Sequence, residues 1–254
     1  MSDRDMIVER AVHPRWRSNT FLIAAAPGSQ AVFVDAGAGV ERLLARADEL
    51  SLEVTHVLVT HRHEDHVEEA GLVRERFSDV EVLCHPAERE HVPAATGHLT
   101  PGARLTIGEL TVDVLETPGH TRGAVCPLVD GHLFTGDTLF RRSVGGIVSP
   151  GHTTFADLRY SIMDVVLRAP SDTVILPGHG EATSVREEWE QNPFVRVWRG
   201  LEPEGTEDCV ADGSPARLIV WAADYDGGHK AWVRRADGRD EILAGSRVER
   251  RSPA

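Results

Sequence analysis

Cysteine, long apolar segments and positive charge are scarce in this sequence of 254 residues. Its three cysteines, Cys84, Cys126 and Cys209, have no Cys-x-x-Cys spacing, which argues against a disulfide framework and indicates buried thiols in a reducing compartment. No stretch reaches the roughly 18 apolar residues that a membrane-spanning helix needs, and the first residues lack a signal-peptide pattern. We therefore expect a cytoplasmic protein without a membrane partner.

The charge balance excludes a second class of partner. Twenty-seven basic residues against 40 acidic ones leave a formal net charge of −13 at pH 7, and such a surface repels a nucleic-acid backbone. Hydrophobic residues make up 41% and charged residues 26% of the chain, as in globular domains. We expect no nucleic-acid partner, and one large domain with a small appendage.

Hydrophobic periodicity predicts strands and helices that alternate in two halves of similar size. The first half contains a strand hairpin, a helix, a strand and a second helix, over 20–25, 31–35, 40–50, 54–60 and 67–77. The second half contains three strands, a helix, a strand and a further helix, over 110–135, 154–166, 173–176 and 184–192. Thr154 with Asp157, and Ser184 with Glu187, have the spacing of helix caps.

The composition becomes polar and acidic near residue 201. We predict a main domain over 1–200, followed over 201–254 by a linker and a small β extension. Three short strands are expected in the extension, over 216–222, 230–235 and 240–243. A sheet of this size is rarely stable alone, so we expect it to pack on the main domain, at the mouth of the site or at the interface of a homodimer.

Chemistry-bearing side chains concentrate in one short segment. Thr60-His61-Arg62-His63-Glu64-Asp65-His66 places three imidazoles and two carboxylates directly after an apolar strand and before a helix. Imidazole and carboxylate are ligands of zinc, iron and manganese, and a spacing of two residues at a strand end points two rings the same way. The segment therefore predicts a metal site. We expect Arg62 within it to be a solvated charge.

Three further polar residues follow apolar strands and are flanked by glycine. They occur in Pro118-Gly119-His120, Gly136-Asp137-Thr138 and Pro177-Gly178-His179-Gly180. Glycine at a strand end allows the backbone to approach another group closely. Together with the first segment, these residues supply the number of ligands that two metal ions need.

The ordered set His61-x-His63-x-Asp65-His66, His120, Asp137 and His179 resembles the motif of the metallo-β-lactamase superfamily over about residues 19–200. The resemblance implies an α/β fold, the αββα sandwich, with metals at the strand ends. It implies that one ion is held by His61, His63 and His120 and the other by Asp65, His66 and His179, with Asp137 as a bridge. The expected cofactors are two divalent ions, zinc in the first place, with iron and manganese as alternatives.

Two segments resemble the glyoxalase II branch of this superfamily: 134–140, and Pro177–Gly180 followed by Asn192-Pro193-Phe194. Gly146 and Val148 occupy positions where many members of that branch carry Arg and Asp. Glyoxalase II also ends in a helical domain that reads glutathione, whereas strands are predicted here. These departures argue against glutathione itself as the carrier.

The predicted function is hydrolysis of a small-molecule acyl thioester, or a related ester, by water that two metal ions activate. Because a thiol has a pKa of about 8.5, its thiolate leaves with little help from a general acid, which favours thioesters. Asp65 and Asp137 are the predicted catalytic residues and orient the water. Arg141 and Arg142, just after the bridging aspartate, are predicted to bind an anionic end of the substrate.

Three alternatives share the same motif. One is a lactonase or other ester hydrolase of the superfamily. Another is a persulfide dioxygenase, which holds a single non-haem iron with two histidines and one aspartate. The third is a di-iron electron carrier, and no flavodoxin-like segment accompanies the motif here.

Overall fold

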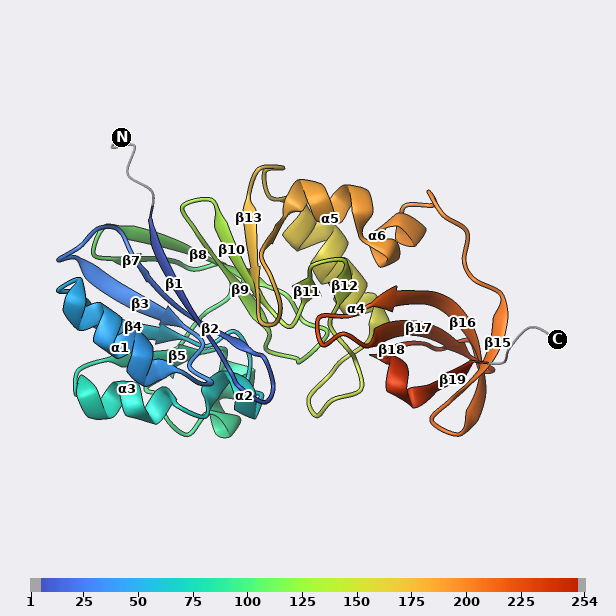
Figure 1. Cartoon of the computed structure of the whole chain (residues 1–254), viewed down its shortest axis with the longest axis horizontal. Coiled ribbons are helices and arrows are strands. Elements are labelled where there is room, and N and C mark those ends of the chain that lie inside the picture. Colours follow the sequence, from blue (N-terminus) through green and yellow to red (C-terminus); the bar gives the residue numbers. More distant parts are fainter. Residues whose placement is uncertain (1–5, 251–254) are drawn as a thin grey trace. The chain divides into compact units, whose positions relative to one another are not determined.

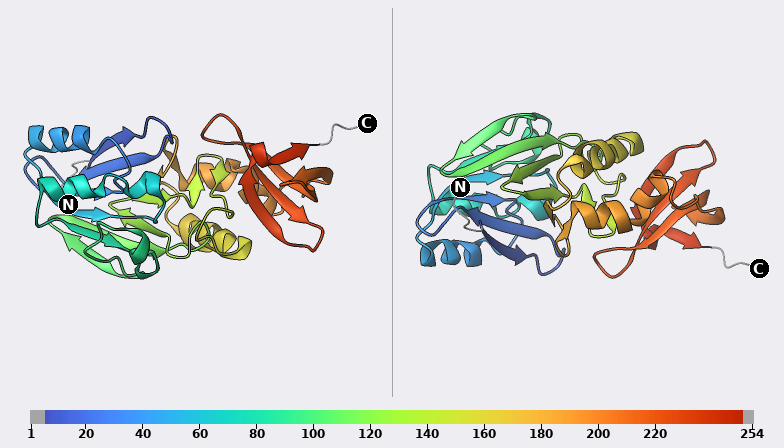
Figure 2. Two further views of the ribbon diagram at one scale, coloured as in Figure 1. Left: turned by 90° about the horizontal axis from the view of Figure 1, so that it is seen from below. Right: turned by 90° about the horizontal axis from the view of Figure 1, so that it is seen from above.

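The computed structural model describes residues 6–250, which divide into two compact units. The first unit contains the chain up to Glu116 together with Gly123–Gly136, and the second contains Thr117–Arg122 and the chain from Asp137 onward. Figures 1 and 2 show the elements of both. Between residues 6 and 250, no helix combines the length and the apolar character required to cross a membrane.

A six-stranded sheet with the order β1-β2-β3-β4-β5-β6 forms one layer of the first unit. Its strands are β1 (Ile7–Val12), β2 (Asn19–Ala24), β3 (Gln30–Val34), β4 (Glu53–Leu58), β5 (Glu81–Cys84) and β6 (Gly97–His98). The β2–β3 hairpin is antiparallel as predicted, and β3 to β6 run parallel. Strand β1 was not predicted. It lies at the sheet edge and is only partly buried, so its apolar pattern is weak.

Helices α1 (Val40–Glu49) and α3 (Ala70–Arg76) pack on this sheet through one buried cluster, in which Val40, Leu43 and Val73 meet strand residues such as Phe33 and Val57. The helix predicted over 67–77 is present as α3, but its predicted start is wrong, because Val67 ends a separate short helix, α2 (Glu64–Val67).

The interruption between α2 and α3 falls at Glu69. Its N–H donates to Ala36 O at 2.8 Å, and its carboxylate accepts from Val40 N at 3.0 Å. The N–H and the carboxylate of Glu69 therefore both bond to the loop after β3, and the helix is interrupted at this residue.

Four antiparallel strands complete the first unit: β7 (Arg104–Ile107), β8 (Leu110–Glu116), β9 (Val125–Val129) and β10 (His132–Gly136), in the order β10-β9-β8-β7. The predicted turn between β9 and β10 is present. Asp130 and Gly131 adopt φ values of 44° and 77°, as a two-residue hairpin turn requires. Gly136 then ends β10 immediately before Asp137.

From Asp137 onward, the second unit contains the hairpin β11 (Leu139–Phe140) and β12 (Ser143–Val144), followed by α4 (Phe155–Tyr160). The hairpin β13 (Val174–Pro177) and β14 (Thr183–Ser184) leads into α5 (Val185–Gln191) and α6 (Pro193–Trp198). Thr154 and Asp157 form the predicted capping box of α4, and Ser184 caps α5. Asn192 ends α5 and caps α6, with Pro193 in its first turn.

The C-terminal part of the second unit is a five-stranded antiparallel sheet with the order β18-β17-β16-β15-β19. The three predicted strands correspond to β16 (Ser214–Ala223), β17 (His229–Arg235) and β18 (Asp240–Ala244), while β15 (Glu207–Ala211) and β19 (Val248–Arg250) were not predicted. On this sheet, the buried Trp232 ring lies 4.9 Å from Phe155 of α4 and 6.2 Å from Trp198 of α6. The domain boundaries stay a prediction.

Candidate metal centre

The segment after β4 carries four of the seven predicted ligands. Strand β4 ends in the core, and His63 is the N-cap of the short helix α2, so His61 and His63 precede the helix while Asp65 and His66 lie in its single turn. The His61 and His63 rings lie 4.8 Å apart at 87°, and a nitrogen of each lies within 3.1 Å of the other. Two imidazoles at this distance present their nitrogens to a common point.

Asp35, directly after β3, holds this segment by hydrogen bonds, and it was not among the predicted site residues. The carboxylate is 2% exposed and accepts from Thr60 N at 2.7 Å and from Thr60 Oγ1 at 2.8 Å. Its Oδ2 also lies 2.8 Å from His66 Nδ1. A carboxylate on Nδ1 fixes the imidazole tautomer and leaves Nε2 available to a metal.

The signal for Asp35 in the sequence is an acidic residue that follows an apolar strand and stands two positions before a glycine, Gly37. Gly37 in the same loop permits a close approach, because a Cβ at this position would lie 1.6 Å from Asp65 O. Ser18 Oγ donates to the same carbonyl at 2.7 Å. The backbone of the ligand segment is therefore held at Asp65 as well as at Thr60.

The other three predicted ligands lie on three separate segments of the second unit. His120 Nδ1 is 2.7 Å from Gly146 O, an arrangement in which Nδ1 donates and Nε2 is left for a metal. Asp137 Oδ2 lies 3.4 Å from His120 Nε2 and 3.4 Å from His179 Nε2. One carboxylate oxygen is thus shared by both histidines.

Glycines explain why these segments approach one another. Gly119 has φ +149°, and a Cβ there would lie 2.6 Å from the backbone of Leu158. A Cβ at Gly145 would lie 1.9 Å from Asp137 O. Any side chain at either position would displace the segment that carries a ligand.

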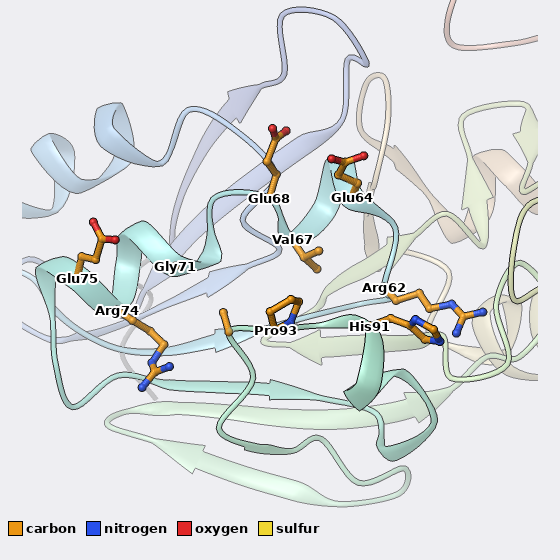
Figure 3. Close-up of a pocket in the computed structure, with 10 residues that line it drawn as sticks. Arg62, Glu64, Val67, Glu68, Gly71, Arg74, Glu75, His91 and Pro93 are labelled. Carbon is orange, nitrogen blue, oxygen red and sulfur yellow. The ribbon is translucent and has the colours of Figure 1, made fainter.

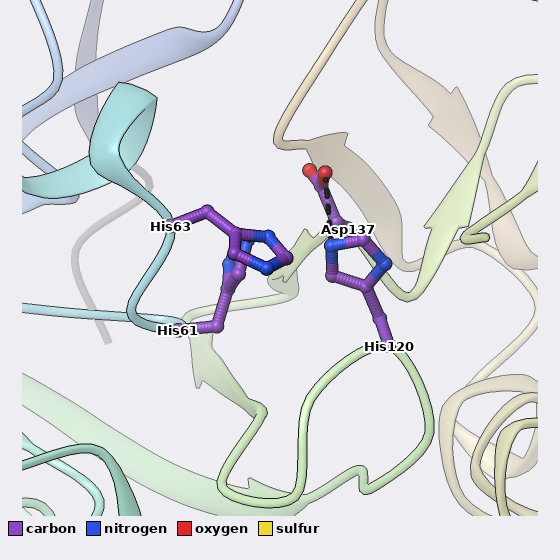
Figure 4. Close-up of side chains that lie close together, drawn as sticks. All are labelled: His61, His63, His120 and Asp137. Carbon is purple, nitrogen blue, oxygen red and sulfur yellow. Dashed lines mark hydrogen bonds and ion pairs between the residues drawn. The ribbon is translucent and has the colours of Figure 1, made fainter. Parts of the chain in front are cut away.

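The structure brings the ligand atoms of all seven residues into two groups. The first is His61, His63, His120 and Asp137, and the second is Asp65, His66 and His179. Within each group these atoms lie within 4.8 Å of one another. In Figure 4, the four side chains of the first group point toward one another. Neutral imidazoles with carboxylates and no thiolate form a donor set that fits zinc, iron or manganese.

The two arginines predicted to bind substrate lie beside α5. Arg141 Nε donates to Glu187 Oε1 at 3.1 Å, and Arg142 contacts both Glu187 and the side chain of Gln191. About half of each side chain is exposed, 49% for Arg141 and 53% for Arg142. Their role in substrate binding stays a prediction.

Arg62 is not the solvated charge that we expected. Its side chain is 18% exposed, and its Nε lies 3.4 Å from Oε2 of Glu88, which is buried. Glu88 Oε1 also accepts from Gly123 N at 2.6 Å. A buried carboxylate needs a cationic partner, and this requirement draws the arginine inward.

Arg62 also lines a pocket of about 850 Å³ in the first unit. Figure 3 shows Val67 and Pro93 in the middle of its lining, with Arg62 and His91 toward one end and Arg74 toward the other. An apolar middle with polar groups at the ends is a common composition for a small-molecule site. Arg62, at one end of this pocket, lies in sequence between the predicted ligands His61 and His63.

The three cysteines belong to neither ligand group. All are buried and free of disulfides. Burial raises the pKa of the Cys84 thiol to about 11 and raises the pKa of Cys209 in the same direction. Thiols that hold their protons at neutral pH are poor nucleophiles and poor metal ligands.

Comparison with known sequences gives consistent results. A family model described as the metallo-beta-lactamase superfamily matches residues 13–179. An uncharacterized protein of Mycobacterium tuberculosis is 34% identical over 208 residues, covering 70% of this chain and 92% of the relative. A hydroxyacylglutathione hydrolase of Xanthomonas axonopodis pv. citri is 32% identical over 166 residues, which cover 65% of this chain and 62% of that relative.

Solved structures are similar over the same part of the chain. ETHE1 from Myxococcus xanthus has a TM-score of 0.67 and 30% identity, covering 78% of this chain and 92% of that one. TTHA1623 in a di-iron-bound form has a TM-score of 0.64 and 30% identity, covering 74% of this chain and all of that one. These matches confirm the αββα fold and the motif resemblance predicted from the sequence.

Proposed function

We propose that this chain, which belongs to the metallo-β-lactamase superfamily, hydrolyses a small-molecule acyl thioester with two divalent metal ions. The observation that carries the proposal is the second ligand group, Asp65, His66 and His179, beside the first. A single-iron dioxygenase shares the motif without using Asp65 or His179 to hold its iron, so the metal content separates the two functions. The donor set fits zinc, and the likeness to a di-iron-bound structure makes iron the first alternative.

Metal ions held by these ligands supply Lewis acidity and lower the pKa of a bound water to about 7. The chain's own carboxylates then have distinct tasks. Asp137 Oδ2 is equidistant from His120 and His179, which suits a residue that serves both ligand groups. Asp65 sits at the start of α2 with its backbone held by Ser18, which gives its carboxylate a fixed position from which to orient water.

The leaving group favours a thioester over an amide. A thiolate departs without a proton, because its conjugate acid has a pKa of about 8.5. The seven clustered residues contain only metal ligands and no additional acid. Burial raises the pKa of Cys84 and of Cys209, which makes these thiols poor nucleophiles and favours water as the nucleophile.

The relative named hydroxyacylglutathione hydrolase supports a thioester, and this chain covers 62% of its length. Gly146 and Val148 nevertheless replace the Arg and Asp typical of the glyoxalase II branch, and a five-stranded sheet forms the C-terminal part. We therefore propose a thiol carrier other than glutathione. The proposal includes a cytoplasmic location and partners limited to small molecules and a second copy of the chain.

An iron-dependent persulfide dioxygenase is the second candidate, favoured by the 30% identity to ETHE1. The two candidates differ in whether they need the second ligand group. A hydrolase needs Asp65, whereas a dioxygenase with one iron does not.

The deciding experiment measures metal content and activity of the purified protein, with S-lactoylglutathione and acetyl-coenzyme A as thioester probes under argon and a persulfide as probe in air. We expect close to two metals per chain, thioester cleavage without oxygen, and loss of most of that activity in Asp65→Ala. Glu64→Ala is the matched control, because Glu64 is the exposed neighbour and belongs to neither ligand group. One iron per chain, oxygen uptake with the persulfide and no anaerobic thioester cleavage would reverse the ranking.

A further inference from the structure

The tip of the β16–β17 hairpin places an aromatic ring against a metal ligand. The Tyr225 ring stacks on His179, with centroids 4.3 Å apart and planes at 16°. Phe140 of β11 lies 5.0 Å from Tyr225 and 5.8 Å from His179, edge-on to both. The imidazole of His179 is therefore confined by two aromatic rings from different segments.

The hairpin also packs on the backbone next to this ligand. Gly180 has φ +76°, and a Cβ there would lie 3.0 Å from Cβ of Tyr225. The Pro-Gly-His-Gly sequence therefore needs its last glycine partly because Tyr225 occupies the space beside it.

A buried ion pair supports the position of Tyr225. Lys230 is the only lysine in the chain, and its Nζ lies 3.0 Å from Asp224 Oδ2, with side chains 9% and 4% exposed. Asp224 Oδ1 accepts from Ser143 Oγ at 2.8 Å. Lys230 Nζ also lies 5.6 Å from the ring centre of Phe140 and 5.8 Å from that of Tyr225.

A buried ion pair is costly unless its remaining hydrogen bonds are made. The partners of Asp224 and Lys230 therefore have to stay in fixed positions. Asp224 is the neighbour of Tyr225 in sequence, and Ser143 belongs to β12, which pairs with the strand of Phe140. The ion pair thus joins the hairpin tip to the segment after Asp137.

We propose that Tyr225 is a positioning residue for His179 and that the Lys230–Asp224 pair holds Tyr225 in place. The C-terminal sheet then supports His179, the member of the second ligand group that lies in the same unit. Groups that orient a metal ligand typically change metal affinity 10- to 100-fold when they are removed. All three supporting residues lie beyond the family match, which ends at residue 179.

The inference rests on the metal-binding part of the proposed function and is independent of the substrate. Its test is stepwise binding of Zn²⁺ to the metal-free full chain in competition with a chromophoric chelator, together with the absorption spectrum of the Co²⁺-substituted protein. Neither readout uses catalysis, so a failure to cleave thioesters would leave this test unaffected.

In Tyr225→Leu, we expect one of the two binding steps to weaken about 10- to 100-fold while the other stays unchanged, with an altered spectrum for the weakened site. Tyr225→Phe keeps the ring and should bind both ions within about twofold of the parent. Tyr160→Leu replaces the only other tyrosine, which is 57% exposed, and should behave as the parent.

Equal weakening of both steps in Tyr225→Leu would overturn the inference, since it would indicate a general loss of structure. Unchanged binding in Tyr225→Leu, or a loss in Tyr225→Phe as large as in Tyr225→Leu, would also overturn it. If Tyr225→Leu does not fold, Lys230→Met provides the same test through the supporting pair and should weaken the same single step.

Discussion

The two units support their predicted metal ligands in different ways. In the first unit, His61 to His66 lie within six consecutive residues, and one buried carboxylate, Asp35, contacts both Thr60 and His66. In the second unit, each ligand has its own support: Gly146 O for His120, the close backbone at Gly145 for Asp137, and the Tyr225 ring for His179.

This difference predicts how each half responds to substitution. Where one residue supports several ligands, its removal affects them together. Where separate contacts support separate ligands, a substitution weakens one ligand and leaves the rest. Asp137 is the exception in the second unit, because a single oxygen of its carboxylate lies near both His120 and His179.

The largest effect is expected for Asp137→Ala. Removal of a carboxylate shared by both ligand groups leaves two cations facing each other without an intervening negative charge. We expect the metal content to fall by more than one equivalent per chain and the turnover to be lost, as measured by elemental analysis and a thioester assay. Two metals per chain with normal activity would show that Asp137 does not bridge.

The second effect concerns the shared support of the first unit. Asparagine tolerates the positive φ of 58° at this position, so Asp35→Asn keeps the backbone conformation and removes one acceptor oxygen. We expect the free energy of unfolding of the metal-free protein to fall by about 2 kcal/mol, because a buried donor of Thr60 or His66 loses its partner. Metal affinity should also fall about 10- to 100-fold. Both quantities are measurable, by urea unfolding and by chelator competition.

Glu188→Gln is the matched control for Asp35→Asn. Glu188 is a buried carboxylate of the second unit that accepts from Thr183, Asn192 and Arg142 N, and it belongs to neither ligand group. Stability should change while metal affinity does not. Equal losses of metal affinity in the two variants would refute a specific role for Asp35.

The control also has a defined pH dependence. Burial raises the pKa of the Glu188 carboxyl, so its favourable contribution is present at low pH and is lost as the pH rises through the folded-state pKa. The stability of the parent relative to Glu188→Gln should therefore decline with rising pH.

The smallest effect is expected for Arg142→Gln. Its exposed ion pair with Glu187 contributes about 0–1 kcal/mol to stability, so the melting temperature should hardly change. If Arg142 binds an anionic end of the substrate, KM should rise about 10-fold with kcat preserved. Arg168→Ala is the control, since Arg168 is 68% exposed in a similar ion pair with Asp164. An unchanged KM for every anionic thioester would remove Arg142 from the site.

The ligands from His61 to His66 were predictable from the sequence, because they all lie between the end of one strand and the start of one helix. The capping residues Thr154 and Ser184 and the Asp130-Gly131 turn were predictable for the same reason: their hydrogen bonds and dihedral angles involve near neighbours in sequence. The strands β1, β15 and β19 are short and only partly buried, so their sequences carry no comparable apolar signal, and they were not predicted.

The order and types of the metal ligands, and with them the family, were legible in the linear sequence, because ligand chemistry resides in the side chain itself. The roles of Asp35 and Tyr225 were not. Asp35 lies 31 residues from His66, and Tyr225 lies on a hairpin beyond the family match. Nothing in their local sequence specifies a partner, because a buried hydrogen bond or a ring stack exists only when folding brings both surfaces into one dehydrated place.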